Sequence, residues 1–342
     1  MKKTSIFISG VTGQDGSLLA SKLIESGFKV IGGFRRGGNN KFWRTDYLNI
    51  TDKIDFVDFH LEDPSQIQSI FNQYRPSFFF NMAGESFVAD SFRYPSLTFN
   101  SNTVSIIHII ESINNFCPDC KCFFASSSEI YGPRVDNQIV SELSSKSPDN
   151  PYGAAKLAAY NLVNIYKNYY DLKLLNGIFF NHESILRSTN FVSRKITMNL
   201  ARLKKNQIGF FELGNINTHR DWGSAGDYVE AIQELLLNFD VIDNFNISTG
   251  NLHTVKDVIL IAAKAIDLNL IYTENNGNTL FVDSTNNKPV IVYNPKYSRK
   301  YEREGYAGDN SKIFKVTGWK PKTLFSDLIS EMAINDYALI KN

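Results

Sequence analysis

The chain has 342 residues, of which 43% are hydrophobic, and its formal net charge is +1 at pH 7. A chain of this length can bury a large core and is long enough for two lobes. The near-neutral charge gives no signature of nucleic-acid binding, and no apolar run approaches the length that spans a bilayer, so we expect a cytoplasmic protein without nucleic-acid or membrane partners.

A glycine-rich segment, residues 10–16 (GVTGQDG), stands between a predicted strand and a predicted helix. Residues 4–9 form an apolar run typical of a buried parallel strand, and residues 17–26 carry apolar side chains at helical spacing before Gly27, which suits a helix end. At such a turn the backbone can approach a pyrophosphate, whose charge the helix N-terminus stabilises. An ordinary glycine-rich loop is the alternative. We expect a dinucleotide site that involves Gly10, Thr12, Gly13, Gln14, Asp15 and Gly16.

The second predicted strand, residues 29–34, is followed by Arg35 and Arg36. A dinucleotide fold that selects NAD usually presents an acidic residue near this point. Guanidinium groups match the geometry of a phosphate, so NADP is the expected cofactor. The alternative is a pair of solvated surface arginines.

Strand-like and helical segments continue to alternate along the chain. Further strands are predicted at residues 54–61, 77–83, 122–126 and 172–180, and helices at residues 64–74, 96–115 and 153–170. The pattern predicts an α/β fold, a Rossmann-like doubly wound parallel sheet with a smaller, interleaved C-terminal substrate lobe. After Asn181 the alternation lapses, and residues 269–288 and 294–309 resemble loops. We assign residues 1–181 and 220–248 to the cofactor domain, and residues 182–219 and 249–342 to the substrate lobe.

Three cysteines lie close together at Cys117, Cys120 and Cys122. A zinc site takes four ligands, usually from two separated pairs, and the sequence has no second cysteine pair. We therefore expect no metal site, but a loop that leads into a buried strand and carries reduced thiols.

Ser127 and Glu129 follow the predicted strand at residues 122–126. Ligands of such sheets bind beyond the carboxyl ends of the strands. Ser127 could hold a substrate hydroxyl, and Glu129 offers a carboxylate of the kind that an elimination needs. The alternative for Glu129 is a carboxylate that faces solvent.

Tyr152 and Lys156 lie four residues apart, just after Pro151 at the start of a predicted helix. A phenol with a pKa of about 10 is a poor base at neutral pH and needs a nearby cation that favours the phenolate. Lys156, one helical turn after Tyr152, can supply that charge and also reach a cofactor ribose. Outside this context, such a pair would be an exposed helical pair.

Together these motifs resemble those of the extended short-chain dehydrogenase/reductase superfamily. More narrowly, the chain resembles the GDP-mannose 4,6-dehydratase family over nearly its whole length. The Tyr-x-x-x-Lys pair is shared by the superfamily. The segments specific to the narrower family are residues 13–16 (GQDG), 181–184 (NHES) and 220–222 (RDW).

The resemblance implies an internal redox dehydration of a nucleotide-diphosphate sugar, preferably GDP-linked. Tyr152 would take the proton of the C4 hydroxyl as a hydride moves from C4 to NADP⁺. Glu129 would then remove the C5 proton while water leaves from C6, and the hydride would return to C6. Ser127, which stands where the family has threonine, and Lys156 complete the catalytic set.

The resemblance also implies the remaining contacts and the assembly. The cofactor would be contacted by His182 and Arg187. The substrate would be bound by Ser86, Asn181, Arg194, Lys195, Arg220, Arg299 and Glu302. A homodimer through the helix that carries Tyr152, or a homotetramer through the Arg35–Arg36 loop, is expected.

The chain departs from the family pattern at three places, one expected near the adenine and two near the sugar, and these two leave the sugar open among GDP-linked mannose derivatives, heptoses and other hexoses. His60 and Leu61 stand where the family has an aspartate near the adenine, Phe87 replaces a histidine, and residues 185–189 read ILRST instead of PRRGE. Two rival functions remain: a nucleotide-sugar 4-epimerase or decarboxylase of the same superfamily, and a non-catalytic NADP-binding regulator.

Overall fold

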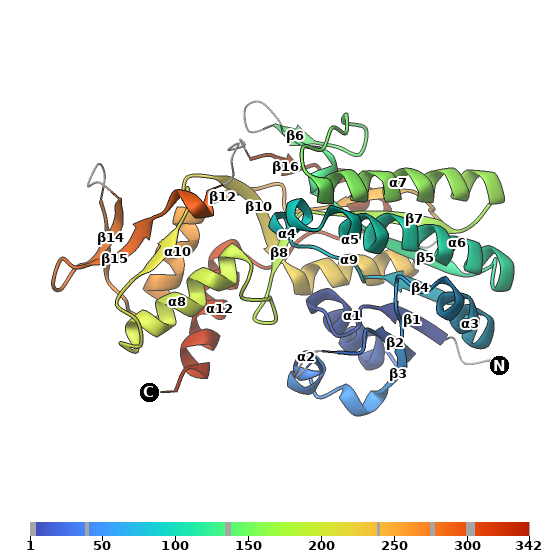
Figure 1. Cartoon of the computed structure of the whole chain (residues 1–342), viewed down its shortest axis with the longest axis horizontal. Coiled ribbons are helices and arrows are strands. Elements are labelled where there is room, and N and C mark those ends of the chain that lie inside the picture. Colours follow the sequence, from blue (N-terminus) through green and yellow to red (C-terminus); the bar gives the residue numbers. More distant parts are fainter. Residues whose placement is uncertain are drawn as a thin grey trace.

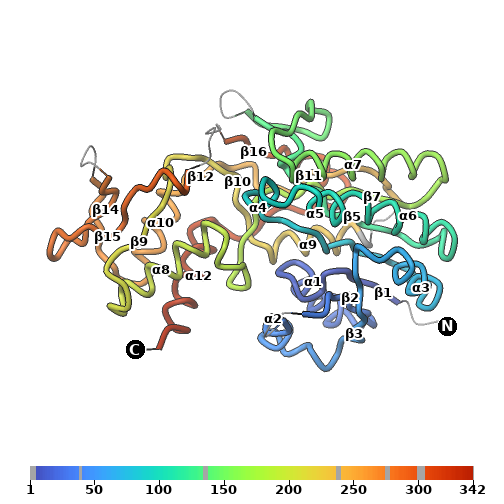
Figure 2. Tube along the Cα trace, viewed as in Figure 1, coloured from blue at the N-terminus to red at the C-terminus, as the bar shows by residue number. Residues whose placement is uncertain are grey.

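The computed structural model describes residues 5–37, 41–133, 138–237, 240–273, 278–298 and 305–341. Within these residues the chain forms two lobes that lie side by side, and the C-terminus lies on the second lobe (Figures 1 and 2). No helix in this part of the chain has both the length and the apolar character that crossing a bilayer requires.

The first lobe is built on a seven-stranded parallel sheet with the order β11-β7-β5-β4-β1-β2-β3. Its strands are β1 (Ser5–Ser9), β2 (Lys29–Phe34), β3 (Ile54–Asp58), β4 (Phe78–Asn81), β5 (Lys121–Ser127), β7 (Leu174–Phe179) and β11 (Asn244–Ile247). The predicted doubly wound parallel sheet is confirmed, and each predicted strand lies within a few residues of an observed one.

Helices cover both faces of this sheet (Figure 1). They are α1 (Gln14–Glu25) and α9 (Ala225–Leu237) against one face, and α3 (Pro64–Tyr74), α6 (Ser105–Phe116) and α7 (Pro151–Tyr170) against the other. Successive side chains of a strand point to opposite faces, so β1 contributes side chains to the cores on both faces of the sheet. Ile6 and Ile8 lie in the core with α1, whereas Phe7 packs in the core with α3 and α6. Burial on both faces explains the continuous apolar runs of the inner strands β1 and β4.

The single helix predicted at residues 96–115 is interrupted. The structure has α5 (Pro95–Phe99), a π-helical turn at Asn100–Val104, and then α6. Asn102, in the turn, donates from Nδ2 to the carbonyl oxygens of Glu85 and Thr98, and Thr103 Oγ1 donates to the carbonyl oxygen of Ala155. Such π turns are frequent at functional sites.

The second lobe has its own core, formed by α8 (Val192–Lys204), α10 (Val255–Ala265) and α12 (Phe325–Leu339). A four-stranded sheet packs against these helices, with β13 (Leu270–Tyr272), β14 (Thr279–Asp283), β15 (Pro289–Tyr293) and β9 (Phe211–Leu213). The prediction of a loop at residues 269–288 was therefore wrong. The strands there are short, and polar residues stand between and beside them, which hides their alternation.

Two smaller sheets complete the fold. One joins β8 (Asn181–Glu183), β10 (His219–Ser224) and β12 (Leu252–Thr254), and the other pairs β6 (Ile139–Val140) with β16 (Ala307–Gly308). We placed residues 249–342 in the second lobe, but α11 (Ser311–Thr317) differs. Ile313 and Trp319 are buried in the first lobe's core, and Trp319 Nε1 donates to the carbonyl oxygen of Asp227 at 3.0 Å.

Candidate active site

The glycine turn lies at the carboxyl end of β1 and opens onto the N-terminus of α1. Gly10 has a φ of +69°, and a Cβ atom on it would lie 2.8 Å from the backbone nitrogen of Ala83. A Cβ atom on Gly16 would lie 2.3 Å from the carbonyl oxygen of Gly10. Only glycine fits these positions, so α1 can begin close to the turn and present backbone N–H groups, an arrangement that suits a pyrophosphate.

The first residues of α1 connect the turn to the second lobe. Gln14 Nε2 donates to the carbonyl oxygen of His182 at 3.2 Å, and Ser184 Oγ donates to Gln14 Oε1 at 2.8 Å. Asp15 Oδ1 lies 3.0 Å from Nε2 of His182. His182, predicted to contact a cofactor, therefore lies beside the glycine turn.

Asp15 and His182 change each other's titration. Burial alone would raise the pKa of Asp15, but attraction to His182 and Arg187 outweighs it and lowers the pKa to about 2. Burial alone would lower the pKa of His182, but Asp15 raises it above its ordinary value of 6.5. The pair is therefore charged over a pH range that reaches above that value.

This pair predicts a pH-dependent contribution to stability. A raised histidine pKa stabilises the fold fully below its ordinary value, and the contribution is lost as pH rises through the folded-state pKa. His182→Gln should therefore lower the free energy of unfolding by about 1–3 kcal/mol at about pH 5.5, and by less at about pH 9. Urea unfolding at both values measures the difference, and His108→Gln, on α6, is the control. Equal losses at the two values would contradict this account.

Arg44, which the sequence analysis did not single out, provides a further connection. It lies in the short helix α2 (Trp43–Tyr47). Arg44 Nη1 donates to the carbonyl oxygen of Thr12 at 3.1 Å, and Arg44 Nε donates to that of Leu186 at 2.8 Å. An isolated arginine gives no signal in the sequence, because both acceptors are backbone atoms of other segments.

Arg35 and Arg36 lie just beyond the carboxyl end of β2, at the same edge of the sheet as the glycine turn. Their side chains are 69% and 77% exposed. Arg36 Nε forms an ion pair with Asp58, at the end of β3, and Arg35 Nη1 lies 3.9 Å from Glu85 Oε1. His60 and Leu61 stand where an aspartate was expected, but Asp58 places a carboxylate at this edge.

The four predicted catalytic residues come together at the carboxyl end of β5. Ser127 ends that strand, and Glu129 lies in the 3-10 turn Ser128–Ile130, where its backbone N–H donates to Ser127 Oγ at 3.3 Å. Tyr152 and Lys156 come from the first turns of α7. The Ser127 side chain lies near the Tyr152 hydroxyl, where it favours the phenolate, and Lys156 Nζ lies 5.9 Å from the centre of the Tyr152 ring.

The electrostatics of Tyr152 differ from the expectation that Lys156 would favour its phenolate. Burial, followed by repulsion from Glu129, raises the pKa of Tyr152 to about 12, despite the opposing hydrogen bond with Ser127. Burial also lowers the pKa of Lys156 to about 8. The Lys156 ammonium donates instead to the carbonyl oxygen of Ala125 at 2.9 Å. Desolvation of both groups, which a sequence does not reveal, decides the result.

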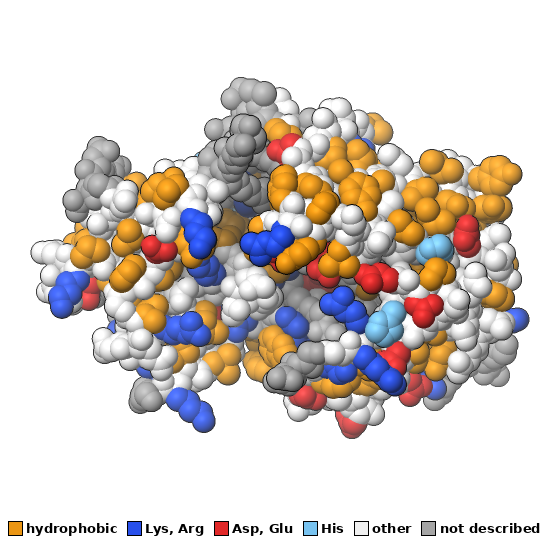
Figure 3. Space-filling view, viewed as in Figure 1, with side chains coloured by type: hydrophobic (Ala, Val, Ile, Leu, Met, Phe, Trp, Pro, Cys, Tyr) orange, Lys and Arg blue, Asp and Glu red, His pale blue; other side chains and the backbone are white. Residues whose placement is uncertain are grey.

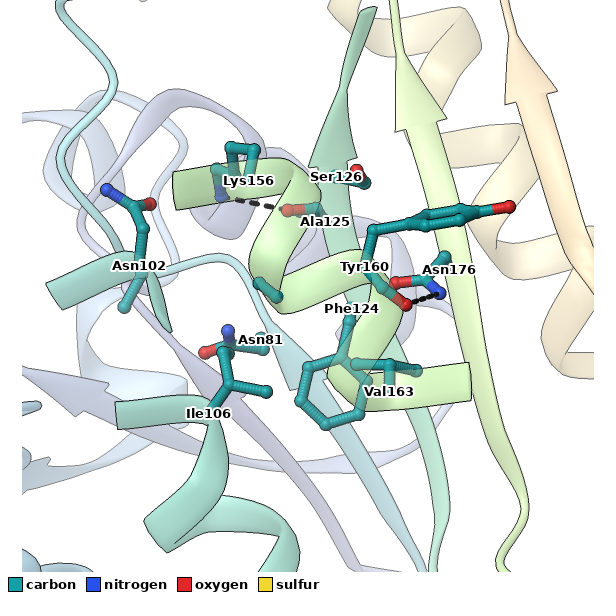
Figure 4. A pocket seen from close by; sticks show the side chains of 12 residues that line it. Asn81, Asn102, Ile106, Phe124, Ala125, Ser126, Lys156, Tyr160, Val163 and Asn176 are labelled. Atoms are coloured by element: carbon teal, nitrogen blue, oxygen red, sulfur yellow. Dashed lines mark hydrogen bonds between the residues drawn. The ribbon is translucent and has the colours of Figure 1, made fainter. Parts of the chain in front are cut away.

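A small cavity of about 10 Å³ lies beneath α7, next to Lys156 (Figure 4). Its polar lining includes Asn81, Asn102 and Ser126, and its apolar lining includes Ile106. A cavity of this volume has room for about one water molecule. The buried ammonium of Lys156 therefore has a polar neighbourhood on the side that faces the sheet.

The predicted substrate residues lie around the junction of the two lobes. In the space-filling view the surface between the lobes is hollowed, and Lys and Arg side chains lie on both sides of the hollow (Figure 3). Asn181 begins β8, Arg220 lies in β10, and Ser86 is exposed in the loop before α4 (Val88–Arg93). Arg299 and Glu302 lie outside the described residues.

Three of the predicted basic residues have partners. Lys195 Nζ donates to the carbonyl oxygen of Glu212 at 3.0 Å, and Arg187 Nε lies 3.2 Å from Glu183 Oε2. Arg194 is 4% exposed, and its Nη2 lies 2.6 Å from Oδ1 of Asp336, a residue of α12. Because its charge is balanced within the second lobe's core, we leave Arg194 out of the proposed substrate site.

Phe87, where the family has a histidine, contacts the second lobe. Its ring packs edge-on against Phe191, with the ring centres 5.8 Å apart. The Arg187 guanidinium carbon lies 3.5 Å from the centre of the same Phe191 ring. The departures at residues 87 and 185–189 therefore belong to one connected region.

Known proteins match nearly the whole chain. A family model described as GDP-mannose 4,6 dehydratase matches residues 7–332. The GDP-mannose 4,6 dehydratase of Cricetulus griseus is 34% identical, over 98% of this chain and 91% of its own length. The RMD structure from Pseudomonas aeruginosa complexed with NADPH aligns with a TM-score of 0.77 at 18% identity, over 98% of this chain and 99% of that one. The structure of dTDP-glucose 4,6-dehydratase from Bacillus anthracis in complex with NAD aligns with a TM-score of 0.79 at 18% identity, over 97% of this chain and 96% of that one. At these identities the two structures share the fold.

Proposed function

The chain belongs to the GDP-mannose 4,6-dehydratase family and is a nucleotide-sugar 4,6-dehydratase, for which we propose GDP-mannose or a related GDP-sugar as the substrate and NADP as the nicotinamide cofactor. One observation supports the elimination chemistry above all: the Glu129 carboxylate lies at the N-terminus of α7, where it accepts a hydrogen bond at 2.8 Å from Nδ2 of Asn150, the residue two before Tyr152. An elimination needs a carboxylate near the hydride-transfer site, whereas epimerisation alone and cofactor sensing do not. Family membership separately favours the dehydratase over an epimerase, a decarboxylase or a cofactor-binding regulator.

The residues divide the chemistry as follows. The glycine turn and Lys156 would hold the cofactor, with Arg35 and Arg36 at the 2′-phosphate. Tyr152, with Ser127 beside it, would take the proton of the C4 hydroxyl. Glu129 would take the C5 proton and pass it to the departing C6 hydroxyl, so that water leaves, and a proton would be restored at C5 when the hydride reaches C6. When bound, an oxidised nicotinamide supplies positive charge that favours the phenolate, accepts a hydride from C4 and returns it to C6. Tyr152 keeps its proton at neutral pH until such a charge is near, because its pKa is about 12.

Isotope labelling tests the proposed reaction. Substrate with deuterium at C4 should give a 4-keto-6-deoxy product with deuterium at C6, and loss of the label to solvent would contradict the internal hydride transfer. The choice of substrate is tested with a panel of GDP-, UDP-, CDP- and dTDP-sugars. GDP-linked sugars should give products lighter by one water, and turnover of another nucleotide alone would overturn the GDP assignment.

Cofactor choice is tested at Arg36. A charge-assisted hydrogen bond contributes about 1.5–3 kcal/mol, so Arg36→Ala should weaken NADPH binding by about 10–100-fold and change NADH binding little. Lys29→Ala, at the opposite end of β2, is the matched control, since Lys29 is also exposed and paired with a carboxylate, Asp55, at 2.7 Å. Dissociation constants from nicotinamide fluorescence measure both effects. Tighter NADH than NADPH binding by the wild type would refute the NADP assignment.

We also infer a homodimer through α7 and the neighbouring short helices. Ile165 and Tyr169, on α7, are 60% and 78% exposed, and Phe92, on α4, is 64% exposed. Apolar side chains gather over α6 and α7 in the space-filling view (Figure 3). Gathered exposed apolar side chains of this kind favour an interface. Light scattering should give twice the mass of the chain or a multiple of that, and a monomer with and without NADP would contradict the inference.

A further inference from the structure

Asn150 caps the helix that carries Tyr152 and Lys156. It precedes Pro151, has extended backbone angles (φ −137°, ψ 155°), and its Oδ1 accepts a hydrogen bond from the backbone N–H of Gly153 at 2.8 Å. Its side chain is therefore held in one orientation. Because the amide oxygen faces the helix N-terminus, the amide nitrogen faces away from it.

The amide nitrogen of Asn150 contacts the carboxylate of Glu129. Asn150 Nδ2 donates to Glu129 Oε2 at 2.8 Å and to Asp149 Oδ1 at 3.2 Å, so its two hydrogens both serve carboxylates. Asn150 is 5% exposed, which protects the contact from competing water. The turn that carries Glu129 also packs tightly on α7, because a Cβ atom on Gly153 would lie 2.6 Å from the carbonyl oxygen of Glu129. Backbone and side chain thus hold Glu129 against one helix end.

Among the residues favoured at a helix N-cap, asparagine alone carries the acceptor for the cap and a donor on two separate atoms. Serine caps equally well and threonine somewhat less well, but the single hydroxyl oxygen that caps the helix also carries their only donor hydrogen, on a shorter side chain. Aspartate also caps well but would place a second carboxylate against that of Glu129, next to Asp149. Asparagine accepts from the helix with its oxygen and donates to Glu129 with its nitrogen.

We propose that Asn150 is a positioning residue for the Glu129 carboxylate. This inference rests on the proposed role of Glu129 as the base that removes the C5 proton. A donated hydrogen bond favours the ionised carboxylate, which is the form that accepts a proton, and fixes its direction. Among the described residues, the titratable groups near Glu129 include Tyr152 on α7 and Asp149, whose carboxylate accepts from the same amide nitrogen, and Lys156 lies one turn further along α7.

Asn150→Ser tests the inference because it keeps a good cap and removes the amide nitrogen that donates to Glu129. We expect kcat to fall about tenfold, with KM, NADPH binding and the unfolding midpoint nearly unchanged. With substrate deuterated at C5, the isotope effect on kcat should increase, whereas that at C4 should not. The acid limb of the pH–rate profile should move to higher pH. Asp63→Ser changes another side-chain N-cap, on α3, and is the matched control.

Two further variants separate the possible outcomes. Asn150→Asp keeps the cap and repeats the test if the serine variant unfolds, with a larger shift of the acid limb expected. A stable Asn150→Ser enzyme with wild-type kcat, isotope effects and pH profile would overturn the positioning role and leave Asn150 as a cap only. Glu129→Gln distinguishes this failure from a failure of the proposed function: if Glu129→Gln retains full activity, the role of Glu129 itself is refuted.

Discussion

Glu129→Gln is expected to lower the rate of dehydration by about 10²–10⁴-fold, the usual contribution of a general base. Glutamine has nearly the same size as glutamate and does not take up a proton. The hydrogen bond that the carboxylate accepts from Asn150 at 2.8 Å can pass to the amide oxygen, so the fold should survive. Turnover of GDP-mannose measures the loss, and Glu111→Gln, on α6, is the control.

The same variant should still begin the reaction. NADPH binding should be unchanged, and the absorbance of reduced nicotinamide should appear when substrate is added, because removal of the C4 hydrogen comes before the step assigned to Glu129. Dehydration at the wild-type rate would remove Glu129 from the mechanism.

Tyr152→Phe should fail one step earlier. The change removes only the phenol hydroxyl, which lies near Ser127 and is the group assigned to take the C4 hydroxyl proton, so we expect the first hydride transfer to slow by about 10²–10⁴-fold. No absorbance of reduced nicotinamide should appear on the timescale of wild-type turnover. Stopped-flow absorbance with substrate in excess measures the step.

The comparison of the two variants separates the two roles, because Glu129→Gln should accumulate reduced cofactor and Tyr152→Phe should not. Tyr166→Phe, on the same helix, controls for loss of a phenol from α7. Wild-type hydride transfer in Tyr152→Phe would show that another group takes the C4 hydroxyl proton.

Local patterns predicted the first lobe well. Strands of a sheet covered on both faces are short, continuous apolar runs, as β1 and β4 show, and they end where a glycine or a polar residue begins a turn. The rule that ligands lie beyond the carboxyl ends of parallel strands also brought Ser127 and Glu129 to the right edge. The second lobe has no comparable signal, and β13 and β14 therefore escaped prediction.

What the sequence did not reveal depends on partners far along the chain. Arg194 was expected to bind a substrate phosphate, and nothing in the sequence connects it with Asp336. Thr197, three residues after Arg194, donates to the same carboxylate, which lies 139 residues further along the chain. Burial raises the pKa of Tyr152 to about 12, and the spacing of Tyr152 and Lys156 in the sequence does not encode that burial. Asn150 was overlooked for a related reason: its second role requires the position of Glu129, 21 residues earlier.

The contacts between the glycine turn and residues 182–186 bear on how the enzyme would retain the oxidised sugar intermediate. Gln14, Asp15 and Arg44 link the glycine turn, which we propose binds the cofactor, directly to residues 182–186, where the second lobe begins. In the proposed reaction, loss of the oxidised sugar midway would leave a reduced cofactor with no acceptor for its hydride. These links would hold the two binding segments together until the hydride has returned.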